Sequence, residues 1–205
     1  MRNLGTALAL AGAALLGFAG VTYTRGAIER DRARSHWEQA VARAARTQAV
    51  AAASNAGSAE KARRGVPVAR LLIPALALDE VVIEGVGDRE LNRGPGHMPE
   101  SVTPGEAGNS IVSAHRDRHF ARLGALRIGD TVTTQTLSES VTWIVVRRRV
   151  VPRETRVLTD RGLPELTLTT CWPIRWLGPA PQRLIVTATP LRHQPIGSEL
   201  ASSRL

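Results

Sequence analysis

Three side chains that could carry nucleophilic chemistry stand at the ends of predicted β-strands. Cys171, the only cysteine of the chain, closes an alternating run that begins at Glu165, and Arg183 opens the next such run. His115 ends a third run, which begins at Asn109. A free thiol near pKa 8.5 is only about 3% thiolate at pH 7, so it needs a base or a cation beside it to become a useful nucleophile. A histidine supplies either partner, and an arginine offers fixed N–H donors to a developing oxyanion.

The alternation of apolar residues predicts which way two of these groups point. In the cysteine run the leucines share the core face, so Cys171 lies on the opposite face with the threonines. In the last run Leu184, Val186 and Ala188 share the core face, and Arg183 faces away from it. If the two strands are neighbours, the thiol and the guanidinium leave the sheet on its outer face.

The elements that must position these groups are short runs rich in β-branched residues and punctuated by Gly and Pro. The pattern predicts strands near residues 68–73, 80–84, 109–114, 131–137, 142–150, 165–170 and 184–189. It also predicts a helical turn at 88–92 and a loop at 94–99. Many short strands with little helix between them predict an all-β domain, a closed antiparallel barrel without exposed edges.

The N-terminal third has a different composition. Leu4 to Tyr23 is an uncharged, mostly apolar stretch of about 20 residues, the length of a membrane-spanning helix. We therefore expect residues 1–24 to be a retained membrane anchor, because a cleaved signal would have a shorter apolar core. Residues 25–65 are predicted to form an exposed or membrane-proximal helical stalk and then a flexible linker from Ala51. Residues 66–192 would form the catalytic domain and 193–205 a loose tail.

The charge of the chain narrows the classes of partner. Its formal net charge is +9, almost all of it from scattered arginines, and only 3% of residues are aromatic. Nucleic-acid surfaces combine basic stripes with aromatic stacking platforms, so this pattern argues against a nucleic-acid partner and favours a basic surface near a membrane or cell wall. The single cysteine excludes an internal disulfide.

At this point the motifs resemble those of the sortase family, in the family's order, across about residues 66–191. The landmarks are Gly94 to His97, Pro104-Gly105, Gly108-Asn109, His115 to Asp117, Phe120, Leu123, Gly129-Asp130, Leu168 to Cys171, and Arg183. The proline directly after Cys171-Trp172 and the arginine-led final strand are similar to variants found in Gram-negative bacteria, sometimes grouped with class D. Two positions depart from the common pattern, because Ala114 stands where Gly is frequent and Trp172 where Tyr is frequent.

The resemblance implies an eight-stranded barrel behind a membrane anchor, with His115, Cys171 and Arg183 as the catalytic residues. It also implies cleavage of an LPxTG-like sorting signal between Thr and Gly, through an acyl-enzyme on Cys171 that an amine or water resolves. The partner would be a secreted protein that carries the signal. The catalytic domain would lie on the extracytoplasmic side of the membrane, which is the periplasm in a Gram-negative cell. Counted by the arginines that follow the span, the positive-inside rule would place it on the cytoplasmic side instead.

Other residues are candidates with two interpretations each. Asp117 could orient the histidine loop or be a solvated acid, and Thr169 and Thr170 could bind substrate or simply favour a strand. The long, apolar segment from Trp172 to Gln182, which includes Ile174, could wall the groove for the leucine and proline of the signal. It could equally fold over the edge of the barrel.

Two further histidines compete with His115. His97 and His119 lie nearby in sequence, and the spacing of His115 and His119 matches helical metal ligands. They follow a strand, however, and no third ligand is evident, so no metal or other cofactor is expected. Two other functions stay open: a peptidoglycan-directed cysteine enzyme such as an L,D-transpeptidase, and a membrane-tethered barrel that binds without catalysis.

Overall fold

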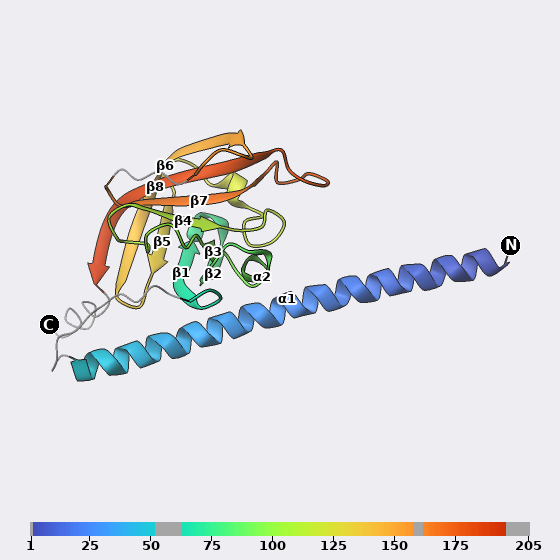
Figure 1. Ribbon diagram of the computed structural model, residues 1–205, viewed down its shortest axis with the longest axis horizontal. Coiled ribbons are helices and arrows are strands. Elements are labelled where there is room, and N and C mark those ends of the chain that lie inside the picture. The colour runs from blue at the N-terminus through green and yellow to red at the C-terminus, as the bar shows by residue number, and fades with distance from the viewer. Residues whose placement is uncertain (1, 52–62, 158–161, 196–205) are drawn as a thin grey trace.

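The computed structural model describes residues 2–51, 63–157 and 162–195. In these segments a long helix lies along one side of a closed β-barrel (Figure 1). The strands are β1 (Pro67–Ile73), β2 (Leu78–Glu84), β3 (Gly96–His97), β4 (Asn109–Ser113), β5 (Thr131–Gln135), β6 (Glu139–Pro152), β7 (Glu165–Trp172) and β8 (Gln182–Pro195). The helices are α1 (Arg2–Ala51), α2 (Asp88–Leu91), and the 3-10 turns η1 (Pro74–Leu76) and η2 (Leu123–Ala125).

The eight strands of the described chain are ordered β1-β2-β3-β4-β7-β8-β6-β5, and β5 closes the barrel against β1. This confirms the closed eight-stranded barrel. The expectation of a wholly antiparallel barrel is wrong, because β3 runs parallel to β2 and β7 runs parallel to β4. Parallel neighbours need a long crossover. Between β4 and β7 that crossover contains η2, β5 and β6.

The barrel interior is filled by alternate residues of every long strand. Trp143, Phe120, Leu71, Leu168 and Val186 are fully buried members of this core. The indole N–H of Trp143 donates to the hydroxyl of Thr134 at 2.8 Å, so the largest core side chain has its polar atom paired. The predicted inward face of the last two strands is confirmed, since their leucines and Val186 belong to this cluster.

Strand β3 lies where the sequence predicts a loop. It is only two residues long, and it fits between β2 and β4 because Gly96 has no side chain. A Cβ there would collide with the carbonyl oxygen of Gly85 and lie 2.8 Å from Leu91 Cδ2. Glycine is disfavoured in most strands, so composition alone hides this one.

Helix α1 corrects the expectation of an exposed stalk. Ala33 and Trp37 are buried against Val81 and Ile83, the outward-facing residues of β2. Arg34 donates to the carbonyl oxygen of Asp79 at 3.1 Å, which adds a polar contact to the same interface. The middle of α1 is therefore part of the folded domain and covers the outside of the barrel.

The N-terminal part of α1 continues past the end of the barrel (Figure 1). Among the residues described above, no helical stretch is both apolar and long enough to cross a bilayer. The predicted linker falls mostly on residues 52–62, outside the described residues. The predicted tail begins too early, because β8 runs to Pro195 by pairing with the start of β6, and 196–205 lie outside the described residues.

Candidate active site

Cys171 lies near the end of β7, and its free thiol belongs to an exposed residue. Arg183, near the start of β8, is its direct cross-strand partner in the antiparallel β7–β8 pair. Directly opposed residues of an antiparallel pair project from the same face, with Cα atoms about 4.5–5.5 Å apart. The two strands are therefore neighbours, which is the condition under which the alternation sends the thiol and the guanidinium out on the same face.

His115 reaches the same level from the other side of β7. Strands β4 and β7 are parallel, and Ser113 of β4 is aligned with Thr169 of β7. The alignment continues past the strand: the Ala114 N–H donates to the Thr169 carbonyl at 3.2 Å, and the Thr170 hydroxyl donates to the Ala114 carbonyl at 2.7 Å. His115 is the next residue. The histidine therefore follows β4, the cysteine lies on β7 and the arginine lies on β8, and these three strands are neighbours in the barrel.

The surroundings of His115 favour the neutral imidazole. Burial of the half-buried ring lowers the pKa of His115 below its ordinary value. The carboxylates of Asp117 and Asp88 oppose this shift. The charges of Arg118 and His119 add to it. A neutral imidazole can accept a proton, which is the requirement for a base that activates a thiol.

The outer face of β7 is less open than the alternation suggests. Thr167 and Thr169 are 2% and 4% exposed. Beside them, Ile111, Ile185 and Val157 form a buried cluster outside the barrel, with Val157 supplied by the segment between β6 and β7. The cover ends before Cys171, so the thiol is reachable where the two threonines are not.

The four residues proposed for substrate binding have different environments. Thr170 is buried with its hydroxyl bonded to a backbone carbonyl, whereas the Thr169 hydroxyl is buried and accepts or donates no hydrogen bond in the described structure. Trp172 packs partly against the barrel core, and its ring would meet a Cβ placed on Gly124 at 3.0 Å. Of the four, Ile174 lines the pocket described next.

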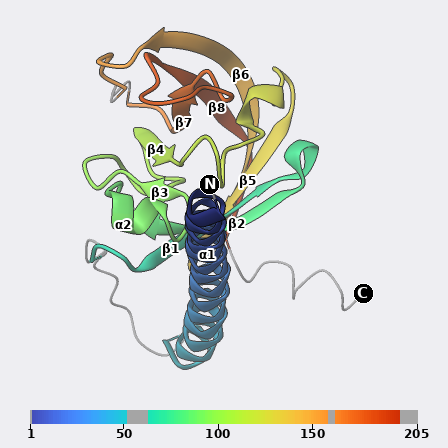
Figure 2. The ribbon, with the colours of Figure 1, turned by 90° about the vertical axis from the view of Figure 1, so that its right-hand side faces the viewer.

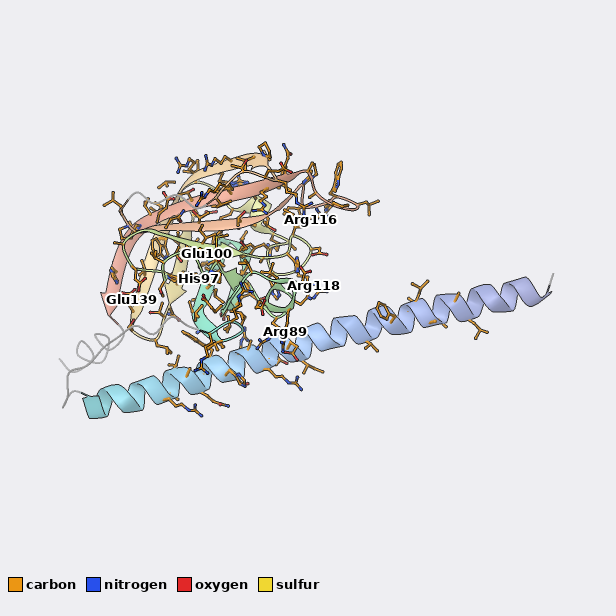
Figure 3. All side chains as sticks on the ribbon, viewed as in Figure 1. Arg89, His97, Glu100, Arg116, Arg118 and Glu139 are labelled. Atoms are coloured by element: carbon orange, nitrogen blue, oxygen red, sulfur yellow. The ribbon has the colours of Figure 1, made fainter. Side chains whose placement is uncertain are left out.

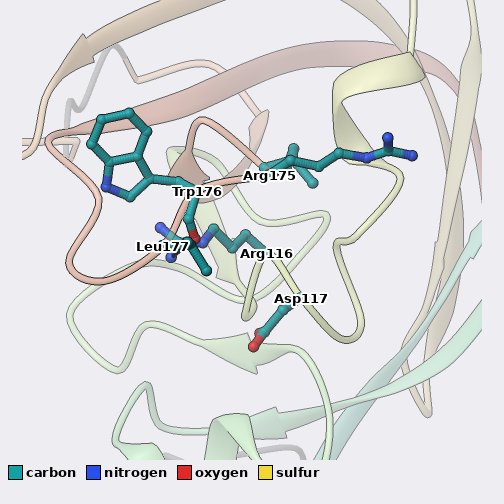
Figure 4. Close-up of a pocket in the computed structure, with 6 residues that line it drawn as sticks. Arg116, Asp117, Arg175, Trp176 and Leu177 are labelled. Carbon is teal, nitrogen blue, oxygen red and sulfur yellow. Dashed lines mark hydrogen bonds between the residues drawn. The ribbon is translucent and has the colours of Figure 1, made fainter.

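That pocket, of about 430 Å³, lies between the loop after β4 and the loop that joins β7 to β8. Figure 4 shows its lining, which consists of Arg116, Asp117, Ile174, Arg175, Trp176 and Leu177. The pocket walls are the segments that directly follow His115 and Cys171 in the chain. Asp117 is exposed at this pocket, so the structure places it beside the site, and the expectation that residues 172–182 form a wall there is consistent with the geometry.

Arg116 is a residue of this site that the sequence did not single out. Its Nη2 atom donates to the carbonyl oxygens of Trp176 and Gly178, at 3.0 and 2.8 Å. It therefore ties the histidine loop to the loop after the cysteine. Its place between His115 and Asp117 is the only sequence signal for it, because the contact depends on two loops that are 60 residues apart.

The two competing histidines are buried in other surroundings. His97 contacts Glu84 at 2.7 Å through Nδ1, and its Nε2 lies 2.9 Å from the Val102 carbonyl oxygen and 3.1 Å from the Ser101 hydroxyl. His119 is also buried, with Nδ1 3.2 Å from a Glu80 oxygen. Neither ring is on an exposed surface, which leaves His115 as the partner placed at the level of Cys171.

The strand order and the site together describe a closed eight-stranded barrel with an exposed cysteine between a histidine and an arginine. This is the architecture of a cysteine enzyme built on a β-barrel. Comparison with known proteins gives the family: the sortase domain model matches residues 71–191, more than half of the chain. The chain belongs to the sortase family.

The similar proteins include several sortases of the D and E types. Sortase D of Bacillus subtilis (strain 168) is 34% identical over 118 residues, which cover 57% of this chain. The matched region spans about 60% of the length of that relative. Sortase E of Streptomyces avermitilis is 30% identical with a TM-score of 0.56, over 67% of this chain and 95% of that one. A Clostridium perfringens sortase D5 transpeptidase shares the fold, with a TM-score of 0.65 at 20% identity over 80% of this chain and 99% of that one.

Proposed function

We propose that this protein is a cysteine transpeptidase that cleaves an LPxTG-like sorting signal of a secreted protein and transfers the new acyl group to an amine or to water. The observation that carries the proposal is the alignment of His115, Cys171 and Arg183 across three consecutive strands, with the thiol exposed. Membership of the sortase family supports it, and the resemblance to sortases supplies the signal and the acceptor.

The proposed reaction begins at Cys171. The neutral imidazole of His115 takes the thiol proton, and the thiolate sulfur attacks the carbonyl carbon of the threonine–glycine bond. Arg183 donates to the oxyanion that forms on the carbonyl oxygen. The imidazolium then protonates the glycine nitrogen, the C–N bond breaks, and a thioester to Cys171 remains. An amine or water then attacks the thioester carbonyl and gives a proton to His115; the C–S bond breaks, and His115 returns that proton to the released thiolate.

Replacing Cys171 tests this proposal. Cys171→Ala is expected to abolish cleavage of a fluorogenic LPxTG-type peptide and to leave the melting temperature of the protein unchanged, because the residue is exposed. Full turnover by the alanine variant would remove the proposed nucleophile. A barrel that only binds would show no turnover in the parent protein, and a peptidoglycan-directed enzyme would ignore the peptide but release products from cell-wall fragments.

The location of the protein is a separate part of the proposal. We propose that the segment from Leu4 to Tyr23 anchors the chain in the membrane with the barrel on the extracytoplasmic side, a placement supported by the apolar sequence and by the sortase resemblance. Cys171 offers a direct test because it is the only cysteine. A membrane-impermeant thiol reagent is expected to label it in intact spheroplasts, and labelling only after lysis would place the barrel on the cytoplasmic side.

A further inference from the structure

The loop between β7 and β8 presents two large apolar side chains at its tip. Leu177 is 98% exposed and Trp176 is 49% exposed. The loop is braced from within: the Trp176 indole N–H donates to the Pro179 carbonyl at 3.1 Å, and Arg116 holds the Trp176 and Gly178 carbonyls. The tip is therefore held out rather than folded onto the barrel. A fixed loop loses little conformational entropy when it meets a partner.

Four exposed arginines lie on this loop, on the loop after β4 and on α2. We call them the basic end of the barrel: Arg89 on α2, Arg118 and Arg122 in the loop after β4, and Arg175 in the β7–β8 loop. The two loops are neighbours, because Arg116 in the loop after β4 donates to carbonyl oxygens of the β7–β8 loop. In Figure 3 Arg89, Arg116 and Arg118 lie at one end of the barrel and Glu139 at the other.

The acidic residues of these segments do not neutralise the basic end. The two loops from His115 to Arg122 and from Trp172 to Gln182 contain four arginines and one carboxylate, that of Asp117. The α2 turn contributes Asp88 and Glu90 beside Arg89. The balance is positive, and the exposed apolar side chains of Trp176 and Leu177 belong to one of these loops, which is the composition of surfaces that meet anionic lipid headgroups.

The same end of the molecule carries the free part of α1. The N-terminal half of the helix projects beyond the barrel on the side of the β7–β8 loop, and the view along that side shows both directed toward the reader (Figures 1 and 2). Large apolar side chains of that half are solvent-exposed: Leu10, Leu15, Leu16 and Phe18. Two apolar features from distant parts of the chain thus point in one direction, and one of them lies on a loop that also carries an exposed arginine, Arg175.

We propose that the basic end of the barrel docks on an anionic phospholipid surface, with Trp176 and Leu177 entering the headgroup region. Tryptophan and leucine suit that boundary, and each arginine near an anionic surface strengthens association about fivefold. Docking holds the end that carries Cys171 toward the bilayer. The proposal concerns this surface alone, so it does not depend on the chemistry of Cys171 or on whether α1 spans the membrane.

An environment-sensitive fluorophore at the loop tip tests the proposal in the full-length chain. Leu177→Cys in a Cys171→Ala background is labelled and reconstituted into symmetric vesicles of phosphatidylcholine, with or without phosphatidylglycerol. We expect a blue-shifted emission that is quenched by doxyl-labelled lipid only in the vesicles with phosphatidylglycerol. The matched control places the same fluorophore at Leu137, between β5 and β6, which is 40% exposed and adjoins Glu139 at the opposite end. It should report water in both vesicles.

Charge variants separate lipid docking from other causes. Changing Arg118, Arg122 and Arg175 together to glutamine is expected to weaken docking on the order of 100-fold, while the triple lysine variant keeps it. High salt should act like the glutamine variant because these charges are exposed. A fluorophore at position 177 that stays in water on anionic vesicles overturns the proposal. So does an equal response on neutral vesicles, or a response only to a sorting-signal peptide, which would assign the tip to a protein partner.

Discussion

The sharpest expectation concerns Arg183, because the register fixes its place so closely. Direct cross-strand partners lie about 4.5–5.5 Å apart at Cα, so in the proposed reaction the guanidinium would reach the carbonyl that the Cys171 sulfur attacks. Removing one well-placed oxyanion donor costs about 10²–10³ in kcat, or about 2.7–4 kcal/mol. Arg183→Ala should therefore lower kcat at least about 100-fold. Arg183→Lys should retain an intermediate rate, because it keeps the charge and loses the fork of donors.

The assay is steady-state cleavage of a fluorogenic LPxTG-type peptide, with kcat and KM determined separately and the melting temperature recorded for each variant. Arg192→Ala is the matched control, since Arg192 is an exposed arginine of the same strand that pairs with Thr142, far along β8 from the thiol. It should leave kcat unchanged. A rise in KM alone for Arg183→Ala would refute the reasoning, because it would give Arg183 a part in binding and none in the transition state.

Other variants test the surroundings of the site. His115→Ala should be nearly as damaging as loss of the thiol, since groups that act as a unit are not additive, and a mild effect would contradict the assignment. The acid limb of kcat/KM should lie below pH 6.5, the ordinary pKa of histidine, because burial lowers the pKa of His115 and the neutral form is the base. Asp117→Asn should move that limb to still lower pH, because it removes a negative charge that raises the pKa of His115. His97→Ala should cost about 3–5 kcal/mol in the free energy of unfolding, measured in urea, by leaving the buried Glu84 carboxylate unpaired. Trp37→Ala should destabilise the α1 interface by up to about 3–5 kcal/mol, and unchanged stability would mean that α1 is not part of the folded domain.

The two-residue periodicity of the sequence was sufficient to predict where the long strands lie and that the three site residues stand at strand ends. Cys171, Arg183 and His115 each stand at the end of a run with two-residue periodicity, and that signal is strong because one side of each strand faces a filled barrel. The succession of short strands predicted a closed barrel, and the resemblance to sortases supplied the number of its strands, which periodicity cannot give. The pairing of β4 with β7 could not be found from the sequence, because parallel partners about 55 residues apart leave no local mark.

The failures have a common physical origin in tertiary contacts. Val81 and Ile83 flank Val82 in an unbroken apolar run, which indicates burial on both faces of β2, yet nothing in the run says that Trp37 supplies the cover. The two-residue strand β3 needs the missing side chain of Gly96 and is hidden by its composition. Thr169 has the parity of Cys171 but is covered by a segment from elsewhere in the chain. Alternation gives the face of a residue and does not give what lies over it.

Trapping the acyl-enzyme tests the central claim most directly. The full-length protein is mixed with the LPxTG-type peptide, quenched in acid and measured as an intact mass, then digested to locate the modified residue. We predict a mass increase equal to the peptide segment that ends at threonine, attached at Cys171, released by hydroxylamine and missing from Cys171→Ala. Turnover of the peptide without an adduct on Cys171, or with an adduct on another residue, would contradict the account.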